Sequence, residues 1–201
     1  MSIFAEQIRK KTMTIAIEGF DLLFDTTARG ETARETLRQV GRAMPGSSFL
    51  LYTPRMPRRD AAERLGMPHN VEFRLPAPQG FHGEIWRLWG IPNHLAADRA
   101  DIFHGPFGRL PLNISSARIA TVVSVADDDL GPGGGVKGWV RRLLAGKACR
   151  SASLIIAGSD EAKERIAGLY GVDKDRVAVI GGGDAKRLEG LYRRLAEGNR
   201  P

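Results

Sequence analysis

The sequence predicts an α/β domain of the Rossmann-like, doubly wound type, with a mainly parallel seven-stranded sheet and helices on both faces. Short apolar, β-branched runs alternate along the chain with helical segments or long crossovers, which is the order of a parallel sheet. Glycine or proline follows most of these runs. The 201 residues are 42% hydrophobic and 26% charged, a composition and length that suit one sizeable core.

The first half of the chain is expected to hold four strands. They are short runs at residues 14–19, 48–53, 70–75 and 101–104, and the third of them alternates apolar and polar residues. The helices expected between them lie at residues 31–43, 58–65 and 83–98. Pro92 is expected to interrupt the last of these helices.

The second half is expected to hold three strands, at residues 118–125, 153–157 and 176–180. The helices expected beside them lie at residues 136–150, 160–170 and 184–197. Residues 1–12 precede the first strand and form an expected N-terminal extension. The Rossmann-like domain is expected to occupy residues 13–183.

Charge and composition narrow the classes of partner. With 30 Lys and Arg against 23 Asp and Glu, the net charge is +7, which favours anionic partners such as nucleotide phosphates or anionic lipid. Solvated helix faces are the alternative explanation of the basic clusters. Zinc-finger spacing and RNP-like aromatic strands are absent from the sequence, so we expect no nucleic-acid partner.

The compartment follows from two further features of the sequence. The apolar runs are all shorter than the roughly 20 residues that span a bilayer. The single cysteine, Cys149, cannot form an internal disulfide and is expected to pack in a helix. We therefore expect a cytoplasmic protein, and contact with the cytoplasmic face of a membrane stays open.

In an open parallel sheet, the ligand crevice lies at the carboxyl ends of the strands. His104 and Gly105 come at the end of the fourth expected strand, and Ser159 follows the sixth. His104 either contacts hydroxyl groups of a ligand or hydrogen-bonds the nearby loop backbone, and Ser159 suits a helix N-cap equally well. The acidic run 127–129 could hold a divalent cation, but no histidine adjoins it, so no metal is expected.

Four stretches, taken together, resemble the N-terminal domain of family-4 glycosyltransferases, which have the GT-B fold. They are residues 15–40; residues 86–111, WRLWGIPNHLAADRADIFHGPFGRLP; residues 119–130, IATVVSVADDDL; and residues 148–183, ACRSASLIIAGSDEAKERIAGLYGVDKDRVAVIGGG. The order and spacing of the four stretches carry the resemblance.

The resemblance implies one half of a two-domain enzyme. In the family, the N-terminal domain mainly holds the acceptor, the C-terminal domain holds the nucleotide sugar, and the sugar is transferred with retention and without an obligatory metal. No cofactor is implied beyond the nucleotide sugar as donor substrate. Residues 184–201 resemble the family's C-terminal helix, which returns to pack on the same domain; a generic terminal helix is the alternative. We expect a donor-domain partner chain or a homodimer, and an isolated chain that is inactive.

The resemblance also places candidate site residues. Ala126 stands where the family has a histidine that reaches the sugar, and Asp127 matches the aspartate after it, which implies an orienting role in catalysis. The substrate-binding candidates surround the expected crevice and are Arg29, Gly30, His104, Gly105, Asp128 and Ser159. At Arg29 and Gly30 the alternative is a capped helix start, and Glu31 would oppose an anion there.

Two functions follow from the resemblance. The first is the acceptor-side half of a retaining sugar transfer. The second is a non-catalytic, degenerate domain that binds a saccharide, a lipid-linked acceptor or a protein, which Ala126 favours because alanine cannot relay a proton. A dinucleotide-binding enzyme is disfavoured, since the first turn lacks G-x-G-x-x-G.

Overall fold

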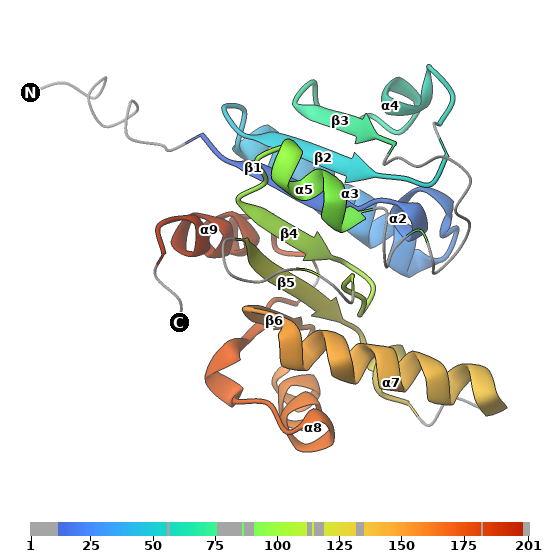
Figure 1. Cartoon of the computed structure of the whole chain (residues 1–201), viewed down its shortest axis with the longest axis vertical. Helices are drawn as coiled ribbons and strands as arrows, with labels where there is room; N and C mark the ends of the chain where they lie inside the picture. The colour runs from blue at the N-terminus through green and yellow to red at the C-terminus, as the bar shows by residue number, and fades with distance from the viewer. Residues whose placement is uncertain are drawn as a thin grey trace, which may run out of the picture.

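The computed structural model describes residues 12–55, 57–75, 86, 91–111, 114, 119–131, 135–181 and 183–198. These residues form one seven-stranded sheet in the order β3-β2-β1-β4-β5-β6-β7 (Figure 1). The strands are β1 Thr14–Glu18, β2 Ser48–Tyr52, β3 Val71–Arg74, β4 Ile102–Gly105, β5 Ala120–Val125, β6 Leu154–Ala157 and β7 Val177–Val179. Every neighbouring pair is parallel, which confirms the predicted fold class.

The chain winds outward in two directions from the centre of the sheet. From β1 it proceeds through β2 to β3 on one side, and from β4 through β5 and β6 to β7 on the other. Strands β1 and β4 are paired at the centre, with Ile17 opposite His104. Their carboxyl ends diverge at this switch point, which is where ligands bind in open parallel sheets.

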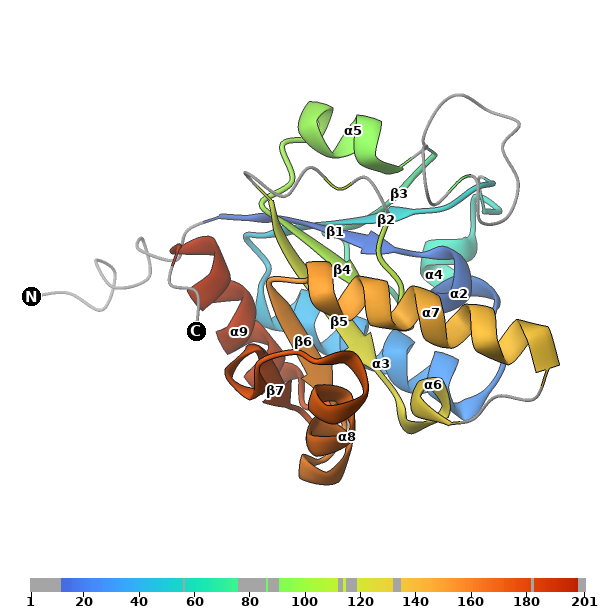
Figure 2. The ribbon, with the colours of Figure 1, turned by 60° about the horizontal axis from the view of Figure 1, so that its bottom comes forward.

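Helices cover both faces of the sheet (Figure 2). They are α2 Phe20–Phe24, α3 Ala28–Ala43, α4 Ala61–Arg64, α5 Ile91–Ala97, α6 Asp127–Leu130, α7 Gly135–Ser151, α8 Asp160–Tyr170 and α9 Ala185–Ala196, with a short 3₁₀ helix, η2, at Lys174–Arg176. The apolar residues of α3 and α9 share one core cluster with one face of the strands. Those of α5 pack over β1, β2 and β4 on the other face, and those of α7 and α8 pack beside them over β5 and β6.

Strand side chains alternate between these two layers, as the period of a strand requires. Ile15 and Ile17 point into the layer of α3 and α9, while Ala16 points into the layer of α5. In β6, Ile156 faces α9 and Ile155 faces α8. Because both faces are covered, most residues of the inner strands are buried, whereas the edge strand β3 has Glu72 and Arg74 exposed. Each fully buried aliphatic side chain contributes about 1.5–3 kcal/mol.

Two one-turn helices, α2 and α6, were not predicted, because four or five residues are too few to show helical periodicity. Helix α3 also begins earlier than expected, at Ala28. The buried side chain of Arg34 in α3 holds the segment that leads from α2 into α3. Its Nη1 donates hydrogen bonds to the carbonyl oxygens of Leu22 and Asp25, each at 2.8 Å.

Pro92 and the segments around it were expected to belong to one interrupted helix. Pro92 is the second residue of α5, where its missing N–H costs no helical hydrogen bond. The segment expected to be helical before it, and residues 1–11, lie outside the described residues apart from Trp86. Among the described helices, none combines the length and the apolar character that crossing a bilayer requires.

Cys149 lies on the inner face of α7. Its side chain has no solvent exposure, and burial raises the pKa of the thiol to about 12. The sequence prediction of a packed cysteine agrees with this position.

Candidate functional site

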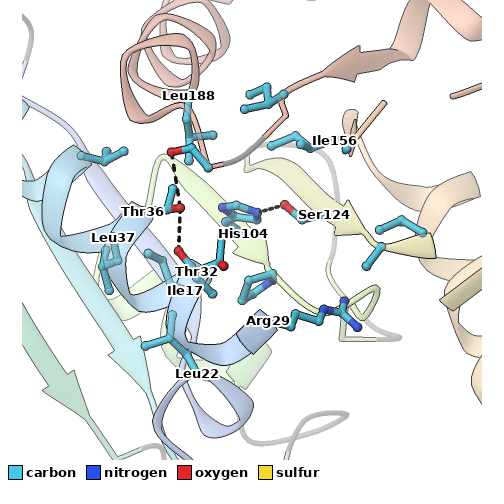
Figure 3. Close-up of a pocket in the computed structure, with 18 of the residues that line it drawn as sticks. Ile17, Leu22, Arg29, Thr32, Thr36, Leu37, His104, Ser124, Ile156 and Leu188 are labelled. Carbon is cyan, nitrogen blue, oxygen red and sulfur yellow. Dashed lines mark hydrogen bonds between the residues drawn. The ribbon is translucent and has the colours of Figure 1, made fainter. Parts of the chain in front are cut away.

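A cavity of about 290 Å³ lies at the carboxyl side of the central strands, between the sheet and helices α3 and α9 (Figure 3). Most of its lining is apolar, including Ile17, Leu22, Leu37, Ile156 and Leu188. The polar side chains on its wall come from four elements and are Arg29, Thr32, Thr36, His104, Ser124 and Tyr192. An apolar chamber with a few converging polar groups is the usual form of a small-molecule site.

His104 stands at the end of β4 and is held from both sides. Its Nδ1 lies 2.5 Å from the hydroxyl of Tyr192 in α9, and its Nε2 lies 2.7 Å from the hydroxyl of Ser124 in β5. The side chain of His104 is 6% exposed, and burial lowers its pKa from 6.5 to about 4. The ring is therefore neutral near pH 7, with one nitrogen donating a hydrogen bond and the other accepting one.

The partners of His104 are side chains rather than the loop backbone. A saccharide hydroxyl that bonded to His104 would have to replace Ser124 or Tyr192. Tyr192 is also fully buried, and burial raises the pKa of its phenol. Tyr192 lies in the helix predicted at residues 184–197, but it is 88 positions from His104 in the sequence, so their pairing leaves no local pattern.

Arg29 lies in the first turn of α3 and reaches across to α6. Its two terminal nitrogens donate hydrogen bonds to the carboxylate of Asp129 at 3.1 and 2.7 Å, and its guanidinium carbon lies 4.9 Å from the centre of the Phe107 ring. The side chain of Asp129 is 3% exposed and also accepts a hydrogen bond from the backbone N–H of Ala126. The bidentate pair thus fixes the wall of the cavity next to Ala126.

Two glycines allow the backbone to pass closely around this site. A Cβ atom on Gly105 would come within 1.8 Å of the carbonyl oxygen of Arg109. A Cβ atom on Gly30 would come within 2.2 Å of the carbonyl oxygen of Asp25. Both positions therefore admit glycine alone without backbone movement, and neither needs a ligand to explain it.

Ala126, which occupies the family's histidine position, and the aspartates that follow it lie in different surroundings. Ala126 lines the cavity, half-buried, directly before α6. Asp127 opens α6 outside the cavity, with a side chain that is 66% exposed and lies 3.5 Å from Arg165. Asp128 is the second residue of α6, and its side chain lies outside the described part of the chain.

Ser159 is the N-cap of α8. Its hydroxyl accepts a hydrogen bond from the backbone N–H of Ala162 at 3.1 Å. The side chain of Glu31, which could have opposed an anion near Arg29, instead forms ion pairs with Arg34 and Arg38. Hydrogen bonds from Arg38 and then Arg34 lower the pKa of Glu31.

The cavity therefore brings together Arg29, His104 and Ala126 among the predicted positions, and it adds Ser124 and Tyr192. Within the described ranges, no group of three or more His, Cys, Asp or Glu side chains is arranged to hold a metal ion. The polar groups on the wall already have protein partners, so a ligand hydroxyl would bind there by adding to or replacing one of these hydrogen bonds.

Comparison with known families decides the class of the protein. The family model of the glycosyl transferase 4-like domain matches residues 31–183, which is most of the chain. The chain belongs to this family. No curated protein matches the sequence of this glycosyl transferase 4-like domain.

Solved structures of Anabaena Alr3699/HepE are similar to this glycosyl transferase 4-like domain. The complex of HepE with UDP and glucose has a TM-score of 0.54 at 17% identity, over 85% of this chain and 44% of that chain. The complex of HepE with UDP-glucose has a TM-score of 0.54 at 18% identity, over 93% of this chain and 50% of that chain. At such identity the similarity establishes the fold, and the domain spans about half the length of HepE.

Proposed function

We propose that this domain is the acceptor-side half of a retaining glycosyltransferase that takes its sugar from a nucleotide sugar. The match of the glycosyl transferase 4-like model to residues 31–183 carries the proposal. The position of the cavity at the switch point between β1 and β4 supports it, since that edge of the sheet is where such folds bind ligands. The acceptor is a saccharide, free or lipid-linked.

The donor half of the site is supplied, in this proposal, by a partner chain. The HepE structures that contain UDP or UDP-glucose are about twice as long as the part that this domain matches. A nucleotide sugar bound to this half alone would lose the contacts of the opposite wall. We therefore expect the isolated chain to lack transfer activity.

The proposal gives Asp127 the task of orienting an acceptor hydroxyl and Arg29 the task of shaping the wall beside it. The carboxylate of Asp127 is exposed outside the cavity but directly follows Ala126 on its wall, so an acceptor that extends from the cavity can reach it. The paired Arg29 and Asp129 hold α6 in place. His104 maintains the wall from inside, since both of its nitrogens are occupied.

Sugar transfer with and without the donor half tests the proposal. We expect no product from the 201-residue chain mixed with UDP-sugars and saccharide acceptors, and product once a co-purified donor-domain chain is added. The Asp127→Asn variant should then lower kcat, while the Asp160→Asn variant serves as a control at the exposed start of α8. Transfer by the isolated chain would contradict the split site.

A non-catalytic binding domain is the second candidate, and Ala126 favours it. Alanine can neither donate a hydrogen bond nor move a proton, and His104 cannot replace the missing histidine because burial holds it neutral between two partners. Such a domain binds the saccharide without turning it over.

The Ala126→His variant separates the two candidates. If the domain is degenerate, the complete pair of chains is inactive, and restoring the histidine raises transfer by roughly 10²-fold, as a positioned acid–base group does. If the domain is catalytic with alanine, the unmodified pair already transfers sugar. Ala62→His in α4, at another half-buried alanine, is the matched control.

A further inference from the structure

Helix α7 turns a stripe of large apolar side chains toward solvent. Val136, Trp139, Val140 and Leu143 are 78%, 63%, 39% and 54% exposed. Their spacing of three and four residues places them on one face of the helix. The described residues include six exposed large hydrophobic side chains, and four of them belong to this stripe, so the exposure is concentrated rather than scattered.

The stripe is not part of the core. Ala145, Ala148 and Cys149 form the opposite face of α7 and pack against the sheet and α8. The N-terminal half of α7 extends beyond the sheet, at the right of Figure 2. The core residues of α7 lie in its C-terminal half, whereas the stripe begins in its N-terminal half and is exposed, so the stripe adds little to the packing of the domain.

Cations continue the same face toward the end of the helix. Lys147 and Arg150 follow Leu143 at four and seven residues, and both are exposed. Arg142 flanks the stripe. A hollow of about 360 Å³ opens beside it, lined by Trp139, Arg142, Leu143, Gly146, Arg150 and Tyr170. A Cβ atom on Gly146 would come within 2.9 Å of the Tyr170 ring, so glycine lets that ring close the floor of the hollow.

We propose that α7 docks this domain on an anionic membrane surface. The apolar stripe enters the boundary between headgroups and acyl chains, and the cations that follow bind lipid phosphates, which is how amphipathic basic helices lie on bilayers. The net charge of +7 favours this occupant over a second copy of the chain, which would bring the same positive charge to an already basic face.

The docking proposal concerns where the domain works and does not depend on sugar transfer. If the domain fails to bind vesicles, the result of the transfer experiment with a water-soluble acceptor is unaffected. If sugar transfer fails, the result of the vesicle experiment is likewise unaffected.

Flotation with vesicles tests the docking. We expect the 201-residue chain to bind phosphatidylcholine vesicles that contain phosphatidylglycerol, to bind pure phosphatidylcholine weakly, and to detach as salt rises. Binding should shift the emission of the exposed Trp139 to shorter wavelength. The Trp139→Leu variant should lose this shift and keep most of the binding.

Two paired variants locate the contact on α7. Lys147→Glu with Arg150→Glu should weaken vesicle binding by about tenfold or more, because each reversal replaces an attraction with a repulsion. Arg58→Glu with Arg59→Glu changes the net charge equally near α4 and should weaken binding far less. Val140→Ser with Leu143→Ser should weaken binding without lowering the unfolding temperature.

Three outcomes would overturn the proposal. They are absence of binding to anionic vesicles, equal weakening by the α7 and α4 charge variants, and a dimer in light scattering that the Leu143 substitution dissociates. The last outcome would identify the stripe as an interface between copies of this chain.

Discussion

A buried histidine with two hydrogen-bond partners defines the centre of the candidate site. His104 joins β4 to β5 through Ser124 and to α9 through Tyr192, so one side chain ties together three elements. Its place at the carboxyl end of a strand was predictable from the pattern of apolar runs. Its partners were not, because a contact between residues far apart in sequence leaves no local pattern.

The depressed pKa of His104 makes the stability of the domain depend on pH. The unfolded chain takes up a proton near pH 6.5, and the buried ring does so at about 4, so the stabilising contribution is complete above pH 6.5 and is lost as the pH falls toward 4. The unfolding free energy should fall by a few kcal/mol over this range, on the order of 1.4 kcal/mol per unit of pKa difference.

Urea unfolding across this pH range measures the effect. His104→Asn should flatten the dependence of the unfolding free energy on pH between 6.5 and 4, relative to the unmodified chain. His69→Asn, at an exposed position, is the control. If the unfolding free energy of the unmodified chain and of His104→Asn depended equally on pH, folding would not lower the pKa of His104, which would contradict this prediction.

Among the elements, α3 contributes more residues to the wall of the candidate site than any other. The sequence predicted a helix at residues 31–43, and Leu37 and Val40 from this range pack in the core. It placed the start three residues late, because Ala28 to Gly30 carry no periodic apolar residue. Contacts with the preceding segment fix the start of the helix. Arg34 donates hydrogen bonds to the carbonyl oxygens of Leu22 and Asp25, and Gly30 lies against the carbonyl oxygen of Asp25.

Two glycine substitutions in helices should act in opposite directions. Gly30→Ala should destabilise the domain by at least about 2 kcal/mol, because the new methyl group overlaps the carbonyl oxygen of Asp25. Gly190→Ala in α9 meets no atom within 4 Å and should stabilise by about 0.5–1 kcal/mol through helix propensity. Thermal unfolding of both variants checks this, and a neutral Gly30→Ala would mean that the loop before α3 can move aside.

At the scale of the whole molecule, strand number and direction were predictable because the strands are short, mostly apolar, separated by helical segments and in most cases followed by glycine or proline. The family followed from the order of four stretches, and the model match to residues 31–183 confirms it. The exposed stripe on α7 was not predicted, since an apolar residue in a helix is normally assigned to the core. Only the packing of Ala145, Ala148 and Cys149 reveals which face of α7 is buried.

The buried thiol of Cys149 can report when α7 separates from the sheet. A thiol with no exposure and a pKa near 12 does not react with alkylating reagents in the folded state. Because the sequence has one cysteine, any labelling reports separation of α7 from the sheet. We expect the rate of Cys149 labelling, followed by mass spectrometry, to be very low without urea. The rate should rise as urea is added, in parallel with global unfolding. Rapid labelling without urea would instead mean that α7 detaches while the rest of the domain stays folded.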